Sequence, residues 1–113
     1  MSNEGPTKMH LTMNRFRVIP GQEDAFEAMW KTRDSHLKSV PGFVSFHLMC
    51  GEIEDGARLY ASHTLWADRA SFEAWTKSEA FRAAHKGAKS SGAMYDGPPV
   101  LECFDSVQAI DAD

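Results

Sequence analysis

The chain has 113 residues, and 12 Lys and Arg against 16 Asp and Glu residues give it a formal net charge of −4. Hydrophobic residues make up 42% and charged residues 25%, the ordinary mix of a globular protein of one domain. The acidic balance argues against a nucleic-acid partner. No apolar stretch approaches the roughly 20 residues that a membrane-spanning helix needs, so a membrane partner is not expected either.

The N-terminal residues 1–8 are polar and show no hydrophobic periodicity, so we expect a disordered tail or an expression remnant there. Residues 9–113 are expected to form the single domain. The N-terminus lacks the apolar segment of a secretory signal. Cys50 and Cys103 do not have the spacing of metal ligands, and we interpret them as reduced thiols of a cytoplasmic protein.

The first half of the chain predicts a strand and a helix. Side chains alternate over residues 10–19, as in a strand with two different faces. One face carries Thr12, Asn14, Phe16 and Val18. Pro20 and Gly21 end the strand, and two acidic residues then favour a helix start. The apolar stripe of this helix is formed by Phe26, Met29, Trp30 and Leu37, and the helix is expected to end at the Val40–Gly42 turn.

Two further strands are predicted over residues 43–50 and 58–66, joined by a hairpin turn at Asp55–Gly56. The second of these strands places four side chains on one face, namely Tyr60, Ser62, Thr64 and Trp66. The alternation is that of a half-buried strand, so this face is expected to meet the helices.

A second helix is expected to begin at Asp68, a good N-cap, and to carry Phe72 and Trp75. Ser78 has the character of another N-cap, which predicts a break near Lys77–Ser78. A helical segment over residues 81–88, a loop over 89–99 and a last strand over 100–110 complete the predicted elements.

The element order is β-α-β-β-α-β, which is typical of a ferredoxin-like α+β fold with both helices on one face of an antiparallel sheet. The opposite face would still carry four apolar side chains, those of Leu11, Met13, Leu59 and Leu65. A monomer would expose them to water, so we expect a homodimer that packs sheet against sheet.

Phosphate-binding, nucleophile-elbow and zinc motifs are missing from the sequence, but the surroundings of His85 indicate a ligand site. Small side chains at positions 83, 84, 87 and 88 would let a flat, bulky group approach, and Phe81 lies one turn earlier. An imidazole placed in this way suits axial ligation of haem iron. The alternative is a histidine that caps the helix C-terminus, where a positive charge is favourable.

Asn14 and Trp75 are the other candidate site residues. Asn14 interrupts an apolar strand face, and a buried amide without a hydrogen bond costs about 1–3 kcal/mol. It therefore either bonds a neighbouring backbone group or points at a bound ligand. Trp75 is either a core residue or part of the same binding wall as His85, which a kink in the helix would allow.

Three stretches resemble the IsdG-type haem-degrading monooxygenases, which belong to the antibiotic-biosynthesis-monooxygenase superfamily of dimeric α+β barrels. They are residues 13–18, residues 40–43 and residues 64–85, and the similarity covers nearly the whole chain after Met9. Its specific part is the order Asn14, Trp75 and His85, with the tryptophan and the histidine ten positions apart.

This resemblance implies a role for each of these residues. His85 is similar to the proximal ligand of haem iron, and Trp75 to the tryptophan that presses on the porphyrin and distorts it. Asn14 matches the asparagine whose amide donates a hydrogen bond to distal dioxygen, and Phe81 is expected to contact haem beside His85. In such enzymes haem is both substrate and cofactor.

The resemblance also implies the reaction and its partners. O2 and electrons open the porphyrin at a meso carbon and release iron, which fits a role in iron acquisition. The electrons are expected from an external reductase or reductant, because the chain has no flavin or nicotinamide motif.

Two other functions are compatible with the sequence. One is a cofactor-free monooxygenase that acts on aromatic polyketides or quinols, and the other is a non-catalytic protein that binds and delivers haem. Addition of hemin followed by a reductant distinguishes the three, because only the first binds haem and consumes it.

Overall fold

The computed structural model describes residues 9–32, 37–79, 81–82 and 94–112. Its four strands are β1 (His10–Val18), β2 (Phe43–Glu54), β3 (Ala57–Trp66) and β4 (Val100–Asp105). Its helices are α1 (Glu23–Thr32), the short 3₁₀ helix η1 (Leu37–Ser39) and α2 (Arg69–Thr76). The described helices include none that is long and apolar enough to cross a membrane.

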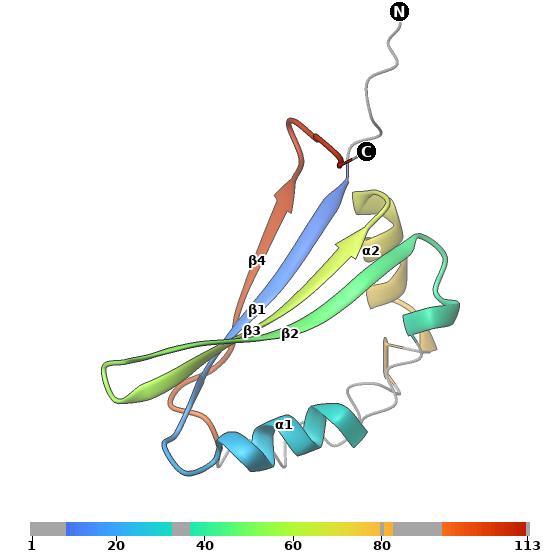
Figure 1. Ribbon diagram of the computed structural model, residues 1–113. Helices are drawn as coiled ribbons and strands as arrows, with labels where there is room; N and C mark the ends of the chain where they lie inside the picture. The colour runs from blue at the N-terminus through green and yellow to red at the C-terminus, as the bar shows by residue number, and fades with distance from the viewer. Residues whose placement is uncertain (1–8, 33–36, 80, 83–93, 113) are drawn as a thin grey trace, which may run out of the picture.

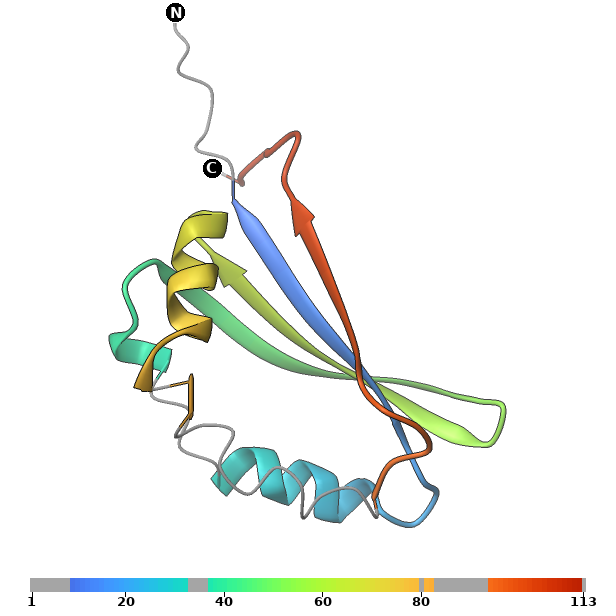
Figure 2. The same ribbon diagram turned by 180° about the vertical axis from the view of Figure 1, so that it is seen from behind.

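The strands form one antiparallel sheet in the order β2-β3-β1-β4, with both helices on the same side (Figures 1 and 2). This is the expected ferredoxin-like α+β arrangement. We call the side of the sheet under the helices the inner face and the other side the open face. On the inner face, β1 buries Thr12, Phe16 and Val18, as the alternation predicted.

The predicted hairpin turn is confirmed, but β2 is longer than predicted. Asp55 and Gly56 both have positive φ, 50° and 81°, as a tight turn between two strands requires. The sequence predicted the end of this strand near Cys50, whereas β2 continues to Glu54. The register of the pairing with β3 shifts between Cys50 and Ile53, and the pairing then resumes. Residues 51–54 therefore stay in the sheet, although their sequence resembles a loop.

The predicted last strand, over residues 100–110, is too long, because β4 ends at Asp105. Among the described strands it pairs with β1, and His10, the first residue of β1, is the register partner of Asp105. A single backbone hydrogen bond follows, from Ser106 N–H to the Met9 carbonyl at 2.8 Å. Val107 and Ile110 are then 95% and 83% exposed rather than paired in the sheet.

Helix α1 is shorter than its apolar stripe predicted. Its described residues run to Thr32, whose hydroxyl donates to the carbonyls of Ala28 and Met29. Leu37 is buried as predicted, but it belongs to the separate 3₁₀ helix η1. Spacing alone could not distinguish one long helix from two pieces that present apolar residues to the same core.

Helix α2 begins and ends where the sequence predicts. The Asp68 carboxylate accepts hydrogen bonds from Ser71 N–H at 2.8 Å and from the Ser71 hydroxyl at 2.7 Å. These bonds hold the pKa of Asp68 below its ordinary value. The helix stops at Thr76, and the Ser78 hydroxyl oxygen then accepts from Phe81 N–H at 3.1 Å, so the predicted break is confirmed.

Gly42 allows the chain to pass closely under α2, and its replacement gives a first testable prediction. Gly42 has φ of +83°, and an added Cβ would overlap the Ser71 side chain, whose hydroxyl is bonded to Asp68. We expect Gly42→Ala to lower the free energy of unfolding by about 2–4 kcal/mol, the sum of backbone strain and overpacking. Urea unfolding followed by circular dichroism measures the change.

Gly21 provides the matched control. Its φ is +94°, but an added Cβ would meet no atom within 4 Å. Gly21→Ala should therefore show the backbone strain alone, about 1 kcal/mol. Equal losses for the two variants would contradict a steric role for Gly42.

Candidate functional site

A row of small polar side chains crosses the middle of the inner face. It consists of Thr12 on β1 and Ser62 and Thr64 on β3, each less than a tenth exposed, and we call these three residues the hydroxyl row. Asn14 is half-buried next to it, and its backbone N–H donates to the Ser62 hydroxyl oxygen at 3.3 Å. This part of the inner face therefore offers hydrogen-bonding groups in place of the apolar side chains usual under helices.

One end of the hydroxyl row meets an aromatic cluster at α2. Trp66 is fully buried, and its Nε1–H donates to the Thr12 hydroxyl at 3.2 Å. The Trp75 ring lies 5.5 Å from that of Trp66, and the Phe81 ring contacts Trp75 edge-on at 4.9 Å. Two further rings complete the α2 cluster, those of Phe43 and Phe72.

The other end of the row meets a second aromatic cluster under α1. Phe26 is fully buried between the rings of Phe16 at 5.3 Å and Tyr60 at 4.6 Å. Trp30 contacts Phe16 and stacks on Phe46 with 5.6 Å between the ring centres. The hydroxyl row and Asn14 thus lie between two aromatic walls, and we call this region the candidate site.

Three of the four predicted site residues lie in the described part of the chain. Trp75 and Phe81 are in direct contact across the break at Ser78. Asn14 is on the same inner face, two residues along β1 from Thr12. Trp66 donates a hydrogen bond to Thr12 and packs against Trp75, so it connects this strand to α2. His85 lies outside the described residues.

Sequence reasoning did not single out Trp66 or the hydroxyl row as parts of this site. Trp66 is a core residue as expected, but it also connects the Thr12 hydroxyl to the Trp75 ring. The available signal was the run Tyr60, Ser62, Thr64 and Trp66 on one strand face. Two hydroxyls between two aromatic residues on a helix-covered face indicate a polar strip within a core.

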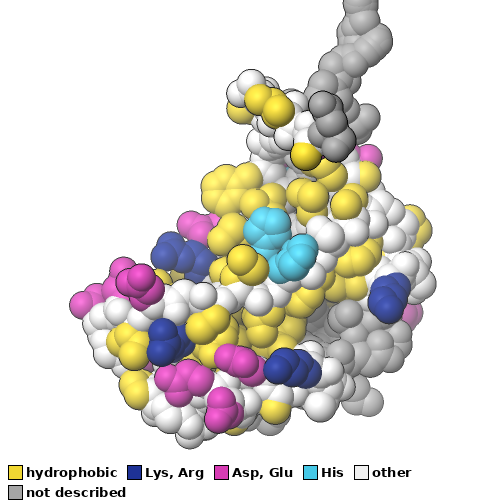
Figure 3. Space-filling model, viewed as in Figure 1, with side chains coloured by type: hydrophobic (Ala, Val, Ile, Leu, Met, Phe, Trp, Pro, Cys, Tyr) yellow, Lys and Arg dark blue, Asp and Glu magenta, His cyan; other side chains and the backbone are white. Residues whose placement is uncertain are grey.

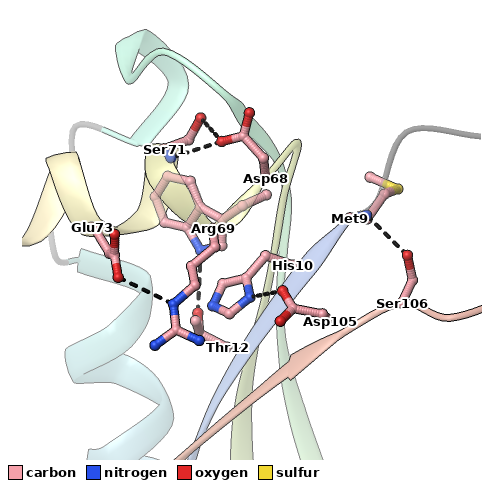
Figure 4. Close-up of polar contacts among 10 residues, drawn as sticks. Met9, His10, Thr12, Asp68, Arg69, Ser71, Glu73, Asp105 and Ser106 are labelled. Carbon is pink, nitrogen blue, oxygen red and sulfur yellow. Dashed lines mark hydrogen bonds and ion pairs between the residues drawn. The ribbon is translucent and has the colours of Figure 1, made fainter.

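A corner of the molecule above the α2 cluster is held by a buried histidine (Figure 4). The His10 Nδ1–H donates to Asp105 at 2.8 Å, and the side chain is 1% exposed. Its ring packs 5.5 Å from Phe72, and Arg69 in the first turn of α2 pairs with Glu73 at 3.1 Å. His10 therefore joins β1, β4 and α2 and is not accessible to a ligand at the candidate site.

A cavity of about 300 Å³ lies on the β2 side of α1, and the aromatic cluster under α1 forms part of its wall. Its wall is formed by Glu27, Trp30, Lys31, Phe46, Leu48, Cys50 and Tyr60. The Tyr60 hydroxyl donates to the Glu27 carboxylate at 2.6 Å, and burial together with this bond raises the pKa of Tyr60 well above its ordinary value. Neither Asn14 nor Trp75 lines this cavity. Because its pKa is raised, Tyr60 stays protonated and donates its hydrogen bond to Glu27 as a neutral group.

No cluster of three or more His, Cys, Asp or Glu side chains suited to a metal ion occurs among the described residues. The described part of the candidate site is instead suited to a flat organic group. It has an amide donor at Asn14, hydroxyls beneath, and indole and phenyl rings at Trp75 and Phe81. Aromatic walls with a few placed polar groups are the usual composition of a small-molecule site.

The chain has a ferredoxin-like α+β fold, and its candidate site lies on the inner face between the two aromatic clusters. The sequence profile described as antibiotic biosynthesis monooxygenase matches residues 9–87. The chain therefore belongs to the antibiotic biosynthesis monooxygenase family, as its resemblance indicated.

Three relatives illustrate the similarity. The heme-degrading monooxygenase of Shouchella clausii (strain KSM-K16) is 41% identical over 51 residues, which are 45% of this chain and 48% of the relative. The match thus spans about half the length of that curated relative. A Bacillus cereus structure assigned to the antibiotic biosynthesis monooxygenases superposes with a TM-score of 0.73 at 14% identity, covering 92% of this chain and 98% of its own.

The third relative is the heme-degrader MhuD from Mycobacterium tuberculosis, whose structure has two hemes bound in its active site. It superposes with a TM-score of 0.68 at 25% identity, over 90% of this chain and 99% of its own. These two solved structures confirm the fold expected from the sequence.

Proposed function

We propose that this protein is a haem-degrading monooxygenase in which haem is both substrate and cofactor. The observation that carries the proposal is that Asn14 and Trp75, two of the three residues of the family resemblance, share the inner face around the hydroxyl row. Membership of the monooxygenase family and the name of the Shouchella clausii relative support it. Iron release would give the protein a role in iron acquisition.

Each residue has a separate task in the proposed reaction. Bound haem supplies the iron centre at which dioxygen and electrons from an external reductant open the macrocycle at a meso carbon. His85 would hold the haem iron through its imidazole. Phe81 contacts the macrocycle beside His85, and Trp75 presses against its plane.

The side-chain amide of Asn14 would donate a hydrogen bond to the dioxygen substrate. A neutral amide orients oxygen without delivering a proton, as a carboxylic acid would, and this favours attack on the ring. The half-buried position of Asn14 supports this role, because a hydrogen bond is stronger away from bulk water.

A titration with hemin followed by a reductant tests the proposal. Hemin should produce a Soret band that saturates with the protein, and ascorbate or a reductase in air should then remove the band and release iron to a ferrous chelator. The same reaction under nitrogen should leave the band in place, because O2 is a substrate.

Two outcomes would replace the proposal with another function. If hemin does not bind, the family membership favours a cofactor-free monooxygenase of aromatic polyketides or quinols. If hemin binds and stays intact with reductant and O2, the protein is a haem-binding or delivery protein.

Trp75→Phe is expected to keep hemin binding within a few-fold and to slow ring opening about tenfold, or about 1.4 kcal/mol in the barrier. A phenyl ring fills less space than an indole, so it distorts the macrocycle less. The decay of the Soret band at saturating reductant measures the rate, and resonance Raman out-of-plane modes of bound haem report the distortion.

Trp30→Phe is the matched control, because Trp30 belongs to the α1 wall and packs on Phe16 and Phe46. Because Trp30 lies in the opposite wall of the candidate site from Trp75, this variant should leave the out-of-plane modes unchanged, whatever its effect on the rate. A Trp75→Phe variant with the wild-type rate would count against a distorting role for Trp75.

A further inference from the structure

Apolar side chains are numerous on the open face of the sheet, which Figure 3 shows from the same side as Figure 1. Register places alternate residues of all four strands on it. Its apolar side chains are Leu11, Met13, Met49, Leu59, Leu65, Val100 and Phe104. Met49, Val100 and Phe104 are each at least half exposed, so the sheet alone does not cover them.

This face is large enough for a protein interface. Four strands about 4.8 Å apart and about 30 Å long give a projected area of roughly 550 Å². That equals the largest apolar patches of ordinary monomers, about 300–600 Å². Protruding side chains make the accessible area of the face larger than its projected area. A stable complex typically buries about 800 Å² of accessible area per partner, and this is the value with which the face is to be compared.

Two histidines lie at the centre of the open face. His47 and His63 are register partners on β2 and β3, with ring centres 6.1 Å apart and planes at 67°. Figure 3 shows histidine side chains next to hydrophobic ones on this face. His63 Nδ1 is buried and has no hydrogen-bond partner within the described part of the chain.

The neighbours of this pair offer no carboxylate to stabilise an imidazolium. On the other side of His63, β1 contributes Met13 as its register partner. Alternate positions along the same strands add Ser45, Met49, Ala61 and Leu65. The next ionised group on this face is Arg15, a cation, and the one acidic side chain of β4 on this face, Glu102, pairs with it at 4.0 Å.

We propose that His47 and His63 make a homodimer of this chain sensitive to acid, because they enter the interface between the two open faces uncharged. The sheet-to-sheet homodimer itself is the one expected from the sequence and the family resemblance, and the proton linkage is a separate property of this face. Below about pH 6.5 imidazoles gain a proton in water, and an imidazolium buried between apolar sheets loses its hydration without gaining an opposite charge. Acid therefore favours the separated copies.

The size of the effect follows from the number of linked protons. If a histidine must stay neutral in the dimer, the dissociation constant rises as the pH falls below the range in which an imidazole gains its proton. The rise is at most tenfold per pH unit for each such histidine. Two copies bring four such histidines. We expect the dissociation constant to rise at least 100-fold between pH 7.5 and pH 5.5.

Sedimentation equilibrium of the haem-free protein measures the dissociation constant of the dimer at pH 7.5 and at pH 5.5. The protein concentration is varied over 0.1–100 µM at constant ionic strength. Circular dichroism at pH 5.5 checks that the chain stays folded. The wild type should be a dimer at pH 7.5 and dissociate at pH 5.5, whereas His47→Gln/His63→Gln should dimerise equally at both. Phe104→Glu, which adds a permanent charge to the open face, should be monomeric at both.

Each contrary result removes a defined part of the proposal. Equal wild-type affinity at the two pH values overturns the proton linkage, and the same pH dependence in the double glutamine variant overturns the assignment to this pair. A wild type that is monomeric up to 100 µM, or a Phe104→Glu dimer, overturns the surface itself. Haem turnover is not used as a readout, so these failures are distinct from failure of the proposed function.

Discussion

His85→Ala is expected to weaken hemin binding about 100-fold, or about 2.7 kcal/mol, and to abolish the spectrum of imidazole-ligated haem. An axial bond to iron is the strongest single contact that a side chain can offer haem, and alanine removes it without adding bulk. Hemin titrations followed by absorption give the affinity, and resonance Raman gives the iron–nitrogen band.

The described histidines strengthen this expectation because they lie elsewhere. His10 is 1% exposed and bonded to Asp105, while His47 and His63 are on the open face, across the sheet from Asn14 and Trp75. Exogenous imidazole should restore the band in His85→Ala, since it can occupy the space that the side chain leaves.

His36→Ala is the matched control, because it removes the one other histidine outside the described residues. It should keep the wild-type affinity and band. If His36→Ala loses the band and His85→Ala keeps it, the assignment of the iron ligand is wrong.

Asn14→Ala should bind hemin with an affinity within a few-fold of the wild type but open the ring about 100-fold more slowly. Removal of one placed hydrogen-bond donor from an enzyme site typically costs this factor in turnover. Stopped-flow absorption at saturating reductant and O2 measures the rate, and the hemin titration shows that binding is kept.

Arg15→Gln, at the adjacent position of β1, controls for disturbance of the strand. Its side chain is exposed on the open face, so the rate of ring opening should not change. Equal rates for Asn14→Ala and the wild type would remove Asn14 from the mechanism and leave it as a structural amide.

The parts of the fold that depend on local patterns could be predicted from the sequence. Alternation identified the inner-face residues of β1 and β3, and the side-chain chemistry of Asp68 and Ser78 identified the start and the break of the second helical region. Asp55–Gly56 identified the hairpin because few residue pairs adopt positive φ at both positions.

Features that depend on long-range pairing could not be predicted in this way. β4 stops at Asp105 because its partner strand β1 begins at His10. The residues next to Asp105 in the sequence carry no information about where β1 begins. The bond between His10 and Asp105 joins residues 95 positions apart.

The candidate site shows the same division. Asn14, Trp75 and Phe81 were found from their residue types and from the family resemblance, and the structure brings Trp75 and Phe81 into contact. The hydroxyl row was missed, because it becomes a row only when Thr12 is paired with Thr64 and Asn14 with Ser62 across two strands.

The hydroxyl row also has a consequence for how long a bound molecule stays. Thr12, Ser62 and Thr64 are each less than a tenth exposed, and the hydroxyl oxygens of Thr12 and Ser62 already accept hydrogen bonds from Trp66 Nε1–H and Asn14 N–H. A macrocycle would thus gain little residence time from what lies beneath it and most from the rings at its edges. Once opening breaks its flatness and its fit to those rings, the product should depart readily, and the next turnover can begin.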